Sequence, residues 1–256
     1  MIKYDSKKLN NLKSKTTNLF LRKLKIIFHV LLDSKFRLLV KQNINLAYRR
    51  RLLESSGVRI IDPMSLSSFD DLELKLWHAE YHMGNTSYLE MMCLLGLVSK
   101  YIDDGKNFLE IGTFDGNMAC NIASNIGKNS KVITLDLPEE SDANNVLEFD
   151  NEIIVSNRRK QKKHLDFSNV EQIYGDSTKL DFSVFDFHGA FIDGGHDLET
   201  VRLDTLNVLN NIQTPGFIAW HDYEMESDIG NLISSLLDSC DVCYVEGTRM
   251  AVLELK

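Results

Sequence analysis

The feature that most constrains the fold is an alternation of short apolar runs with helical patterns from Asn107 to the C-terminus. Strands that alternate with helices favour right-handed βαβ units, which build a mostly parallel sheet with helices on both faces. Five runs are expected to be its strands: Phe108–Ile111, Val132–Leu135, Val170–Tyr174, Ala190–Ile192 and Phe217–Trp220. The sequence therefore predicts a doubly wound α/β sheet.

The last two apolar runs predict a different connection. Val242–Val245 and Met250–Leu255 are separated only by Glu246-Gly247-Thr248-Arg249. A short connection that contains glycine favours a hairpin, so we expect the sheet of seven strands to end in an antiparallel edge.

Before the first of these strands, helical patterns cover Asp70–His82 and Tyr88–Tyr101. The chain of 256 residues is 43% hydrophobic, which suits one α/β domain with an N-terminal extension. A polar stretch with Gly57 and Pro63 separates the two parts. We expect a helical arm over residues 1–60 and the α/β domain over residues 61–256.

The arm and the domain carry opposite charge. The first 51 residues contain 14 Lys and Arg against two Asp, and the other 205 contain 15 basic and 35 acidic residues. The net charges are therefore +12 and −20, which sum to the −8 of the whole chain. An acidic domain is a poor surface for phosphates, so nucleic acid is not an expected partner.

Within the arm, residues 19–40 combine apolar residues at helical spacing with Arg22, Lys23 and Lys25 on the other side. A basic amphipathic helix suits the interface of an anionic membrane. The alternative is a helix that packs on its own domain or on a second copy in a homo-oligomer. Neither a secretory signal nor a spanning segment is visible, so we expect a cytoplasmic protein, with peripheral attachment to the inner face of the membrane if the arm binds lipid.

The segment from Asn107 to Ala119 predicts a strand, a tight glycine turn and a helix, which together form a nucleotide-type pocket. Gly112 and Gly116 allow a sharp turn and a close approach of a ligand. A dinucleotide site would normally show G-x-G-x-x-G, but the second glycine is missing and Asp115 lies in the loop. A carboxylate there repels phosphate and suits a cationic ligand.

Acidic residues also follow the next two strands. Asp136 ends the second strand, where a carboxylate can accept hydrogen bonds from both hydroxyls of a ribose. Asp176 follows the third strand. Acids after successive strands indicate one binding site, because the carboxyl ends of parallel strands meet at the same edge of the sheet.

The ends of the fourth and fifth strands carry candidate catalytic groups. Asp193, His221 and Asp222 offer oxygen and imidazole ligands to a divalent ion such as Mg²⁺ or Mn²⁺. Such a cation would lower the pKa of an acceptor hydroxyl. His196 follows Asp193 closely, and its neutral imidazole could remove the acceptor proton.

These motifs resemble those of class I S-adenosylmethionine-dependent methyltransferases, whose Rossmann-like sheet has seven strands. The glycine segment resembles their motif I, and the elements D-G-G-H at Asp193 and H-D-Y at His221 resemble a bacterial group. That group includes macrolide-sugar O-methyltransferases and cephalosporin-hydroxylase-like proteins. The resemblance covers Thr86 to Lys256.

The resemblance implies further roles for named residues. It assigns Glu110 to the amino-acid end of S-adenosylmethionine and Asp176 to the adenine amino group, and it places Asp193 in the cofactor, catalytic and metal sites. In the metal-dependent sugar enzymes, the Asp of D-x-x-H and an acidic pair bind magnesium, and the His is the base. This chain matches at Asp193, His196 and Asp222, but it has His221 in place of the first acid.

The expected function is methyl transfer from S-adenosylmethionine to an oxygen of a small, sugar-containing or glycan acceptor, with metal assistance. One alternative is a cephalosporin-hydroxylase-like or metal-independent enzyme on the same scaffold. A second alternative is a non-catalytic, membrane-associated binding protein that keeps the fold.

Overall fold

The computed structural model describes residues 58–65, 73–77, 86–138, 166–224, 227–236 and 239–256. These residues belong to a compact unit, Leu53–Lys256. Residues 1–57 of the arm predicted over residues 1–60 lie outside the described residues. Its helix and its partners therefore stay predictions.

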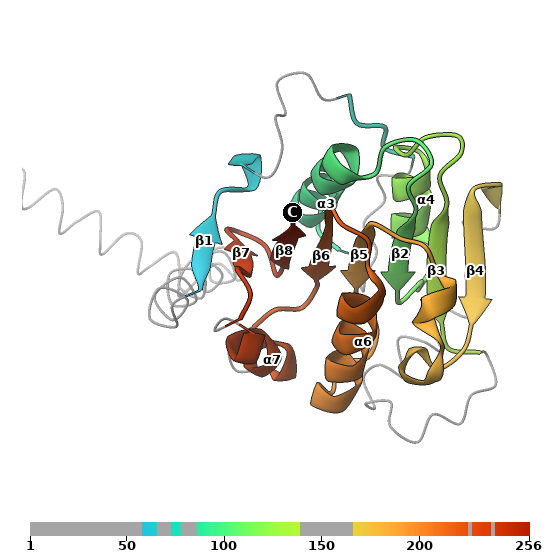
Figure 1. Cartoon of the computed structure of the whole chain (residues 1–256). Coiled ribbons are helices and arrows are strands. Elements are labelled where there is room, and N and C mark those ends of the chain that lie inside the picture. The colour runs from blue at the N-terminus through green and yellow to red at the C-terminus, as the bar shows by residue number, and fades with distance from the viewer. Residues whose placement is uncertain (1–57, 66–72, 78–85, 139–165, 225–226, 237–238) are drawn as a thin grey trace, which may run out of the picture. The chain divides into compact units, whose positions relative to one another are not determined.

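A sheet of eight strands forms the centre of this unit (Figure 1). Its order is β1-β7-β8-β6-β5-β2-β3-β4. The strands are β1 (Arg59–Ile61), β2 (Phe108–Ile111), β3 (Val132–Asp136), β4 (Val170–Tyr174), β5 (Gly189–Ile192), β6 (Gly216–Trp220), β7 (Cys243–Val245) and β8 (Ala251–Leu255). All seven predicted strands are confirmed, within one residue at each end.

The C-terminal hairpin is also confirmed, but it does not end the sheet. β8 is antiparallel to both β6 and β7, and β1 pairs in parallel with β7 beyond the hairpin. The prediction of seven strands with a hairpin edge was therefore wrong by one strand. β1 has only three residues and lies in the polar stretch that indicated a boundary, so the boundary predicted at residue 60 falls inside a strand.

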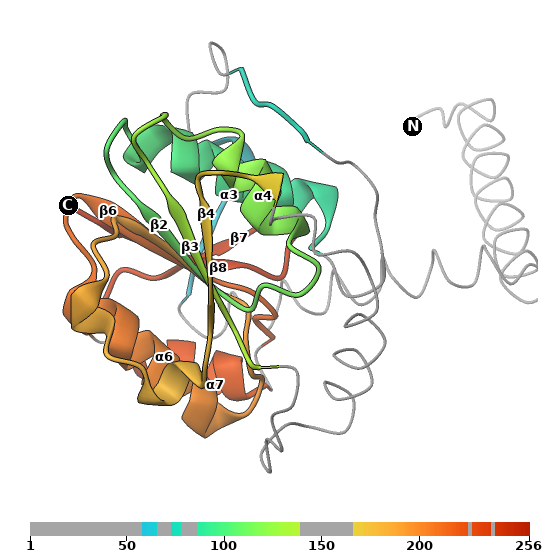
Figure 2. The same cartoon turned by 90° about the vertical axis from the view of Figure 1, so that its right-hand side faces the viewer.

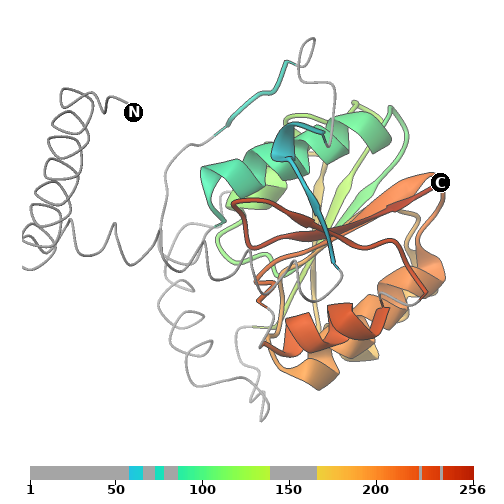
Figure 3. The same ribbon diagram turned by 90° about the vertical axis from the view of Figure 1, so that its left-hand side faces the viewer.

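Two layers of helices cover the sheet (Figures 2 and 3). One face carries α3 (Tyr88–Tyr101), predicted with these bounds, and α4 (Asn117–Ala123). The other face carries α6 (Leu198–Asn211) and α7 (Asp228–Leu236). Short 3₁₀ helices lie at η1 (Pro63–Ser65), η4 (Ser177–Lys179) and η5 (Phe182–Val184). Among the described residues, no helix is long and apolar enough to cross a membrane.

The period of two along each strand divides the core between these layers. Leu109 on β2 packs in the same cluster as Val208 of α6, whereas its neighbour Phe108 packs with Leu94 of α3. Glu110 lies two residues after Phe108 and therefore shares the face that α3 and α4 cover. Both faces of the central strands are buried, which explains their nearly continuous apolar sequences.

The helix predicted over Asp70–His82 is wrong in its described part, because residues 73–77 form no helix. Instead, side-chain amides of α4 and of the residues just after it satisfy this backbone. Lys75 N–H donates to Asn125 Oδ1 at 2.8 Å, and Trp77 N–H donates to Asn121 Oδ1 at 3.0 Å. These tertiary hydrogen bonds hold an irregular segment whose residues have a helical pattern.

The sheet places its ligand edge at the centre. β2 and β5 are neighbours, and the order of the strands along the chain reverses between them. Ligands of open α/β sheets bind at such a switch point, beyond the carboxyl ends of the strands. The loops after β2, β5 and β6 all open at this edge.

Candidate functional site

The glycine loop after β2 lies against the loop after β5. Gly112 has φ +101°, and a Cβ at this position would lie 2.0 Å from the carbonyl oxygen of Asp193. Only glycine tolerates both the dihedral and the approach. Gly116 has φ +79° and begins α4 without a side-chain cap. The two predicted glycines therefore make the turn that brings the loop after β2 (residues 112–116, here the donor loop) next to the loop after β5 (residues 193–197, here the catalytic loop).

Glu110 is buried beneath this loop. Its side chain accepts a hydrogen bond of 2.5 Å from Thr134 Oγ1, on the neighbouring register position of β3. Burial, together with the charges of Asp193, Asp136 and Asp115, raises the pKa of Glu110 to about 8, although the Thr134 hydrogen bond lowers it. A carboxyl group in this position favours a cationic ligand, because a nearby positive charge would stabilise its ionised form.

The other predicted donor residues lie at the strand ends and in the loops. Asp115 is buried, and its Oδ1 accepts a hydrogen bond of 2.9 Å from Asn117 N–H. Asp136 ends β3, and its Oδ1 accepts one of 2.8 Å from Leu137 N–H. Asp176 caps η4 and pairs with Lys179 at 2.6 Å. Their contacts with S-adenosylmethionine stay predictions.

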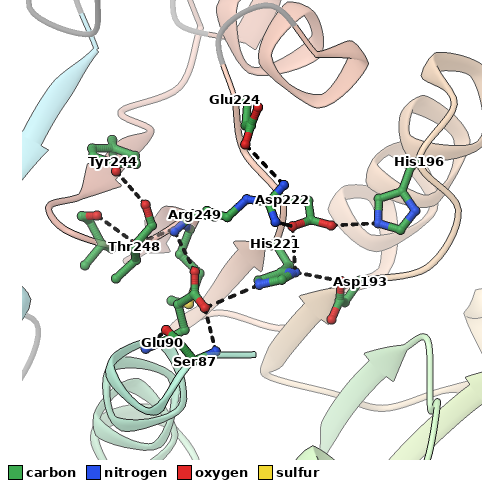
Figure 4. Close-up of polar contacts among 12 residues, drawn as sticks. Ser87, Glu90, Asp193, His196, His221, Asp222, Glu224, Tyr244, Thr248 and Arg249 are labelled. Atoms are coloured by element: carbon green, nitrogen blue, oxygen red, sulfur yellow. Dashed lines mark hydrogen bonds and ion pairs between the residues drawn. The ribbon is translucent and has the colours of Figure 1, made fainter. Parts of the chain in front are cut away.

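The ends of β5 and β6 bring together the four predicted catalytic and metal-site residues (Figure 4). His196 Nε2 lies 2.9 Å from Asp222 Oδ2, and His221 Nδ1 lies 2.9 Å from Asp193 Oδ1. His221 Nδ1 also lies 3.3 Å from Asp222 Oδ1. The sequence placed these residues at one point of the sheet, and the structure confirms that they meet.

Asp222 has an unusual backbone. Its φ of +53° lies in the left-handed region. Residues other than glycine rarely adopt this backbone conformation, which costs them about 1 to 3 kcal/mol. Burial raises the pKa of Asp222, but the His196 hydrogen bond and the charges of His221 and Arg249 outweigh it and lower the pKa to about 2. Strain at a charged, buried residue is typical of functional sites.

Arg249, in the hairpin turn before β8, contributes a positive charge to the site. Its guanidinium lies 2.8 Å from Asp222 Oδ1 and 3.2 Å from Glu224 Oε1. The Arg249 carbonyl also accepts a hydrogen bond of 2.9 Å from Tyr223 N–H, directly after Asp222. The hairpin therefore supports the strained residue through both its backbone and its side chain.

Glu90 is the site residue that sequence reasoning missed. It lies on α3, and its Oε2 is 3.5 Å from His221 Nε2, an ion-pair distance longer than a hydrogen bond. Burial raises the pKa of Glu90, but His221, Ser87 and Arg249 N–H outweigh it and lower the pKa to about 2. The only signal in the sequence is a capping pattern at Ser87 and Glu90, which explains the carboxylate without a role in the site.

His221 is buried among three carboxylates. Burial lowers the pKa of its imidazole, but Asp193, Glu90 and Asp222 outweigh that effect and hold the pKa well above its ordinary value. His221 and Arg249 therefore place two positive charges beside the carboxylates of Glu90, Asp193 and Asp222.

The described residues contain one group that could hold a metal ion, and it differs from the predicted one. Ligand atoms of Asp193, His196 and Asp222 all lie within 4.8 Å of one another. Two carboxylates and an imidazole suit Mg²⁺ or Mn²⁺. His196 takes the place of the predicted His221, whose two ring nitrogens already face carboxylates.

The pKa of Glu110 predicts how stability depends on pH. As the pH rises from 4.5 to about 8, the unfolded chain loses the Glu110 proton while the folded chain keeps it. The wild type should therefore lose stability through this range. Glu110→Gln mimics the protonated form, so its melting temperature should rise relative to the wild type between about pH 5 and pH 8 in the absence of ligand. Thermal melts of both proteins test this, and a constant difference across the range contradicts it.

Comparison with known proteins agrees with this topology. Residues 109–223 match the model of a family described as a methyltransferase domain. A protein-L-isoaspartate O-methyltransferase of Methanococcus maripaludis is 32% identical over 79 residues, which cover 30% of this chain and 31% of that protein. The chain thus spans about a third of the curated relative that it matches.

Solved structures are similar only at a distance. The O-methyltransferase NovP is 11% identical with a TM-score of 0.47, and the match covers 65% of this chain and 79% of that one. An O-methyltransferase from Bacillus cereus, in complex with SAH, is 17% identical with a TM-score of 0.44 and coverages of 68% and 84%. Such scores do not inform on substrate or chemistry. Residues 109–223 are thus similar to a methyltransferase domain, and the strand order is that of a Rossmann-like, mostly parallel α/β sheet.

Proposed function

We propose that this protein transfers a methyl group from S-adenosylmethionine to a hydroxyl oxygen, with His196 as the general base. The observation that carries the proposal is the His196–Asp222 pair, 2.9 Å apart, in loops that adjoin the glycine turn. Asp222 lies in a strained conformation, and Arg249 of the hairpin turn contacts its carboxylate and accepts from the N–H of the next residue, Tyr223.

The acidic groups of the donor loop favour a cationic donor. The charges of Asp115, Asp136 and Asp193 all raise the pKa of the buried Glu110, so a cationic ligand would stabilise its ionised form. When bound, S-adenosylmethionine supplies an electrophilic methyl group on a positively charged sulfonium. Gly112 and Gly116 would let the protein backbone approach the ligand closely, and Asp136 at the end of β3 would accept hydrogen bonds from a ribose.

The His196–Asp222 pair favours oxygen as the acceptor atom. A hydroxyl is a weak nucleophile until its proton leaves, whereas a neutral amine needs no base to attack. When Nε2 donates to Asp222, the imidazole carries its lone pair on Nδ1 and is held in one orientation. Asp222 stays ionised and stabilises the imidazolium that forms. Positioning and a single base suffice for in-line displacement.

A divalent cation is the second candidate in this site. The ligand atoms of Asp193, His196 and Asp222 fit it, and it would supply Lewis-acid activation of the acceptor oxygen. In that arrangement His196 is a ligand and not the base. Arg249 and His196 would also have to share Asp222 with the ion, since each already contacts one of its oxygens.

The proposals for the acceptor, the partners and the location rest on the sequence alone. A small, sugar-containing or glycan acceptor follows from the resemblance of the D-G-G-H and H-D-Y elements. Attachment of the arm to anionic lipid follows from its basic charge and stays a prediction, as does the cytoplasmic location.

Binding of the donor tests the first step. Asp136→Ala removes a charged hydrogen-bond acceptor and should weaken S-adenosylmethionine binding by about 1.5 to 3 kcal/mol in calorimetry. Asp181→Ala, at an exposed aspartate that caps η5, is the matched control and should bind like the wild type. Tighter binding of NAD than of S-adenosylmethionine by the wild type would refute the assignment of the pocket.

Turnover tests the base. With an acceptor identified from a glycan and small-molecule panel and labelled methyl donor, His196→Ala should lower kcat by about 100- to 10,000-fold, because a positioned base is lost. Donor affinity should not change. His188→Gln is the control, since this histidine precedes β5 at the opposite end of the sheet. Equal turnover of the wild type and His196→Ala would exclude His196 as the base.

Chelation separates the base from the metal ligand. If His196 is the base in a metal-free site, the wild type should keep its full rate in excess EDTA. Loss of the rate in EDTA and its recovery with Mg²⁺ or Mn²⁺ would assign Asp193, His196 and Asp222 to a metal site instead.

A further inference from the structure

Glu90 joins three parts of the chain that are distant in sequence. It belongs to the first turn of α3, where Ser87 N–H donates to its Oε2 at 2.8 Å. Its Oε1 accepts a hydrogen bond of 2.6 Å from Arg249 N–H in the hairpin turn. The same carboxylate faces His221 at the end of β6 (Figure 4).

The contacts of Glu90 exceed those of a helix cap. A capping box needs only the reciprocal bonds between Ser87 and Glu90, and both are present. A capping box does not require burial, yet Glu90 is 4% exposed, and its pKa is lowered to about 2. A buried carboxylate is costly unless its partners compensate, and His221 supplies the compensating charge.

His221 connects Glu90 to the catalytic carboxylates. Its Nε2 faces Glu90, and its Nδ1 lies 2.9 Å from Asp193 and 3.3 Å from Asp222. The His221 side chain is only 10% exposed, so its ring has little room to rotate. A rotation of the ring would move the nitrogen that fixes Asp193.

We propose that Glu90 is a positioning residue that holds the His221 ring with Nδ1 toward Asp193 and Asp222. This inference rests on the proposed function for its effect on methyl transfer, but its geometric part stands without it. A carboxylate on the far nitrogen is the usual device by which proteins orient a functional imidazole. Through His221, α3 would thereby set the arrangement of groups on β5 and β6.

Two variants separate this role from helix capping. Glu90→Gln keeps the size of the side chain and a residue type that suits a capping box, but removes the charge that faces His221. It also leaves one oxygen in place of two to accept from Ser87 N–H and Arg249 N–H. Ser87→Ala removes the cap hydroxyl, leaves Ser87 N–H in place and does not touch His221. It should cost about 1 kcal/mol of stability, as the loss of an N-cap does.

In methyl transfer, Glu90→Gln should lower kcat by about 10- to 100-fold, the range for residues that orient a functional imidazole. The KM for the acceptor and the affinity for the donor should stay within about twofold, because neither is bound by Glu90. Ser87→Ala should keep the kcat of the wild type. Loss of kcat in proportion to stability in both variants would assign Glu90 a structural role only.

A second readout does not depend on activity. With ¹⁵N-labelled histidine, the ring signals of His221 can be identified by their absence in His221→Asn. Glu90→Gln should shift both ring nitrogens of His221, whereas Ser87→Ala should leave them in place. Unchanged His221 signals in Glu90→Gln would overturn the proposal. If the wild type binds no donor and transfers no methyl group, the proposed function fails, and this comparison still decides whether Glu90 holds His221.

Discussion

The close contact of the β2 and β5 ends is the constraint on which the site depends. Gly112 leaves no space for a side chain against the Asp193 carbonyl, so the donor loop and the catalytic loop are fixed to one another by backbone. The strand order puts β6 directly beside β5, which brings His221 and Asp222 to the same edge. The Gly112 turn and the His196–Asp222 pair thus lie at the same edge of the sheet although they come from different parts of the chain.

Charge balance is the second constraint at this edge. Glu90, Asp193 and Asp222 are carboxylates, and His221 and Arg249 compensate them from β6 and from the hairpin turn. His221 faces Glu90, so its removal would leave the buried carboxylate of Glu90 without a compensating charge. Asp222, whose φ lies in the left-handed region, contacts Arg249 and lies 2.9 Å from His196 Nε2.

Much of this arrangement could be predicted from the sequence, because strands buried on both faces have continuous apolar runs and functional acids follow them. Asp193, His196, His221 and Asp222 are visible as residues at strand ends. β1 was not predictable, since three residues in a polar stretch give no period, and it forms only because the edge of β7 is available. Residues 73–77 have a helical pattern, yet their backbone N–H groups donate to the side-chain amides of Asn121 in α4 and of Asn125 just after it.

Two features of the site could not be predicted from local sequence patterns: the contact of Glu90 with His221, and the presence of His196 instead of His221 among the candidate metal ligands. The sequence gives residue types at strand ends, but not which ring faces a third carboxylate from a helix far away in the chain. Glu90 has a sufficient local explanation as a capping residue, so nothing in the sequence points beyond it. Its contact with His221 arises only when α3 packs on the sheet near β6.

The most direct test of the central claim is a crystal structure with S-adenosylhomocysteine bound. The account predicts that the ribose contacts Asp136 and that the sulfur lies at the edge between the Gly112 turn and the His196–Asp222 pair. An acceptor oxygen placed there could then reach a donor methyl within about 3 to 3.5 Å. A ligand bound elsewhere, or one whose sulfur points away from His196, would contradict the account.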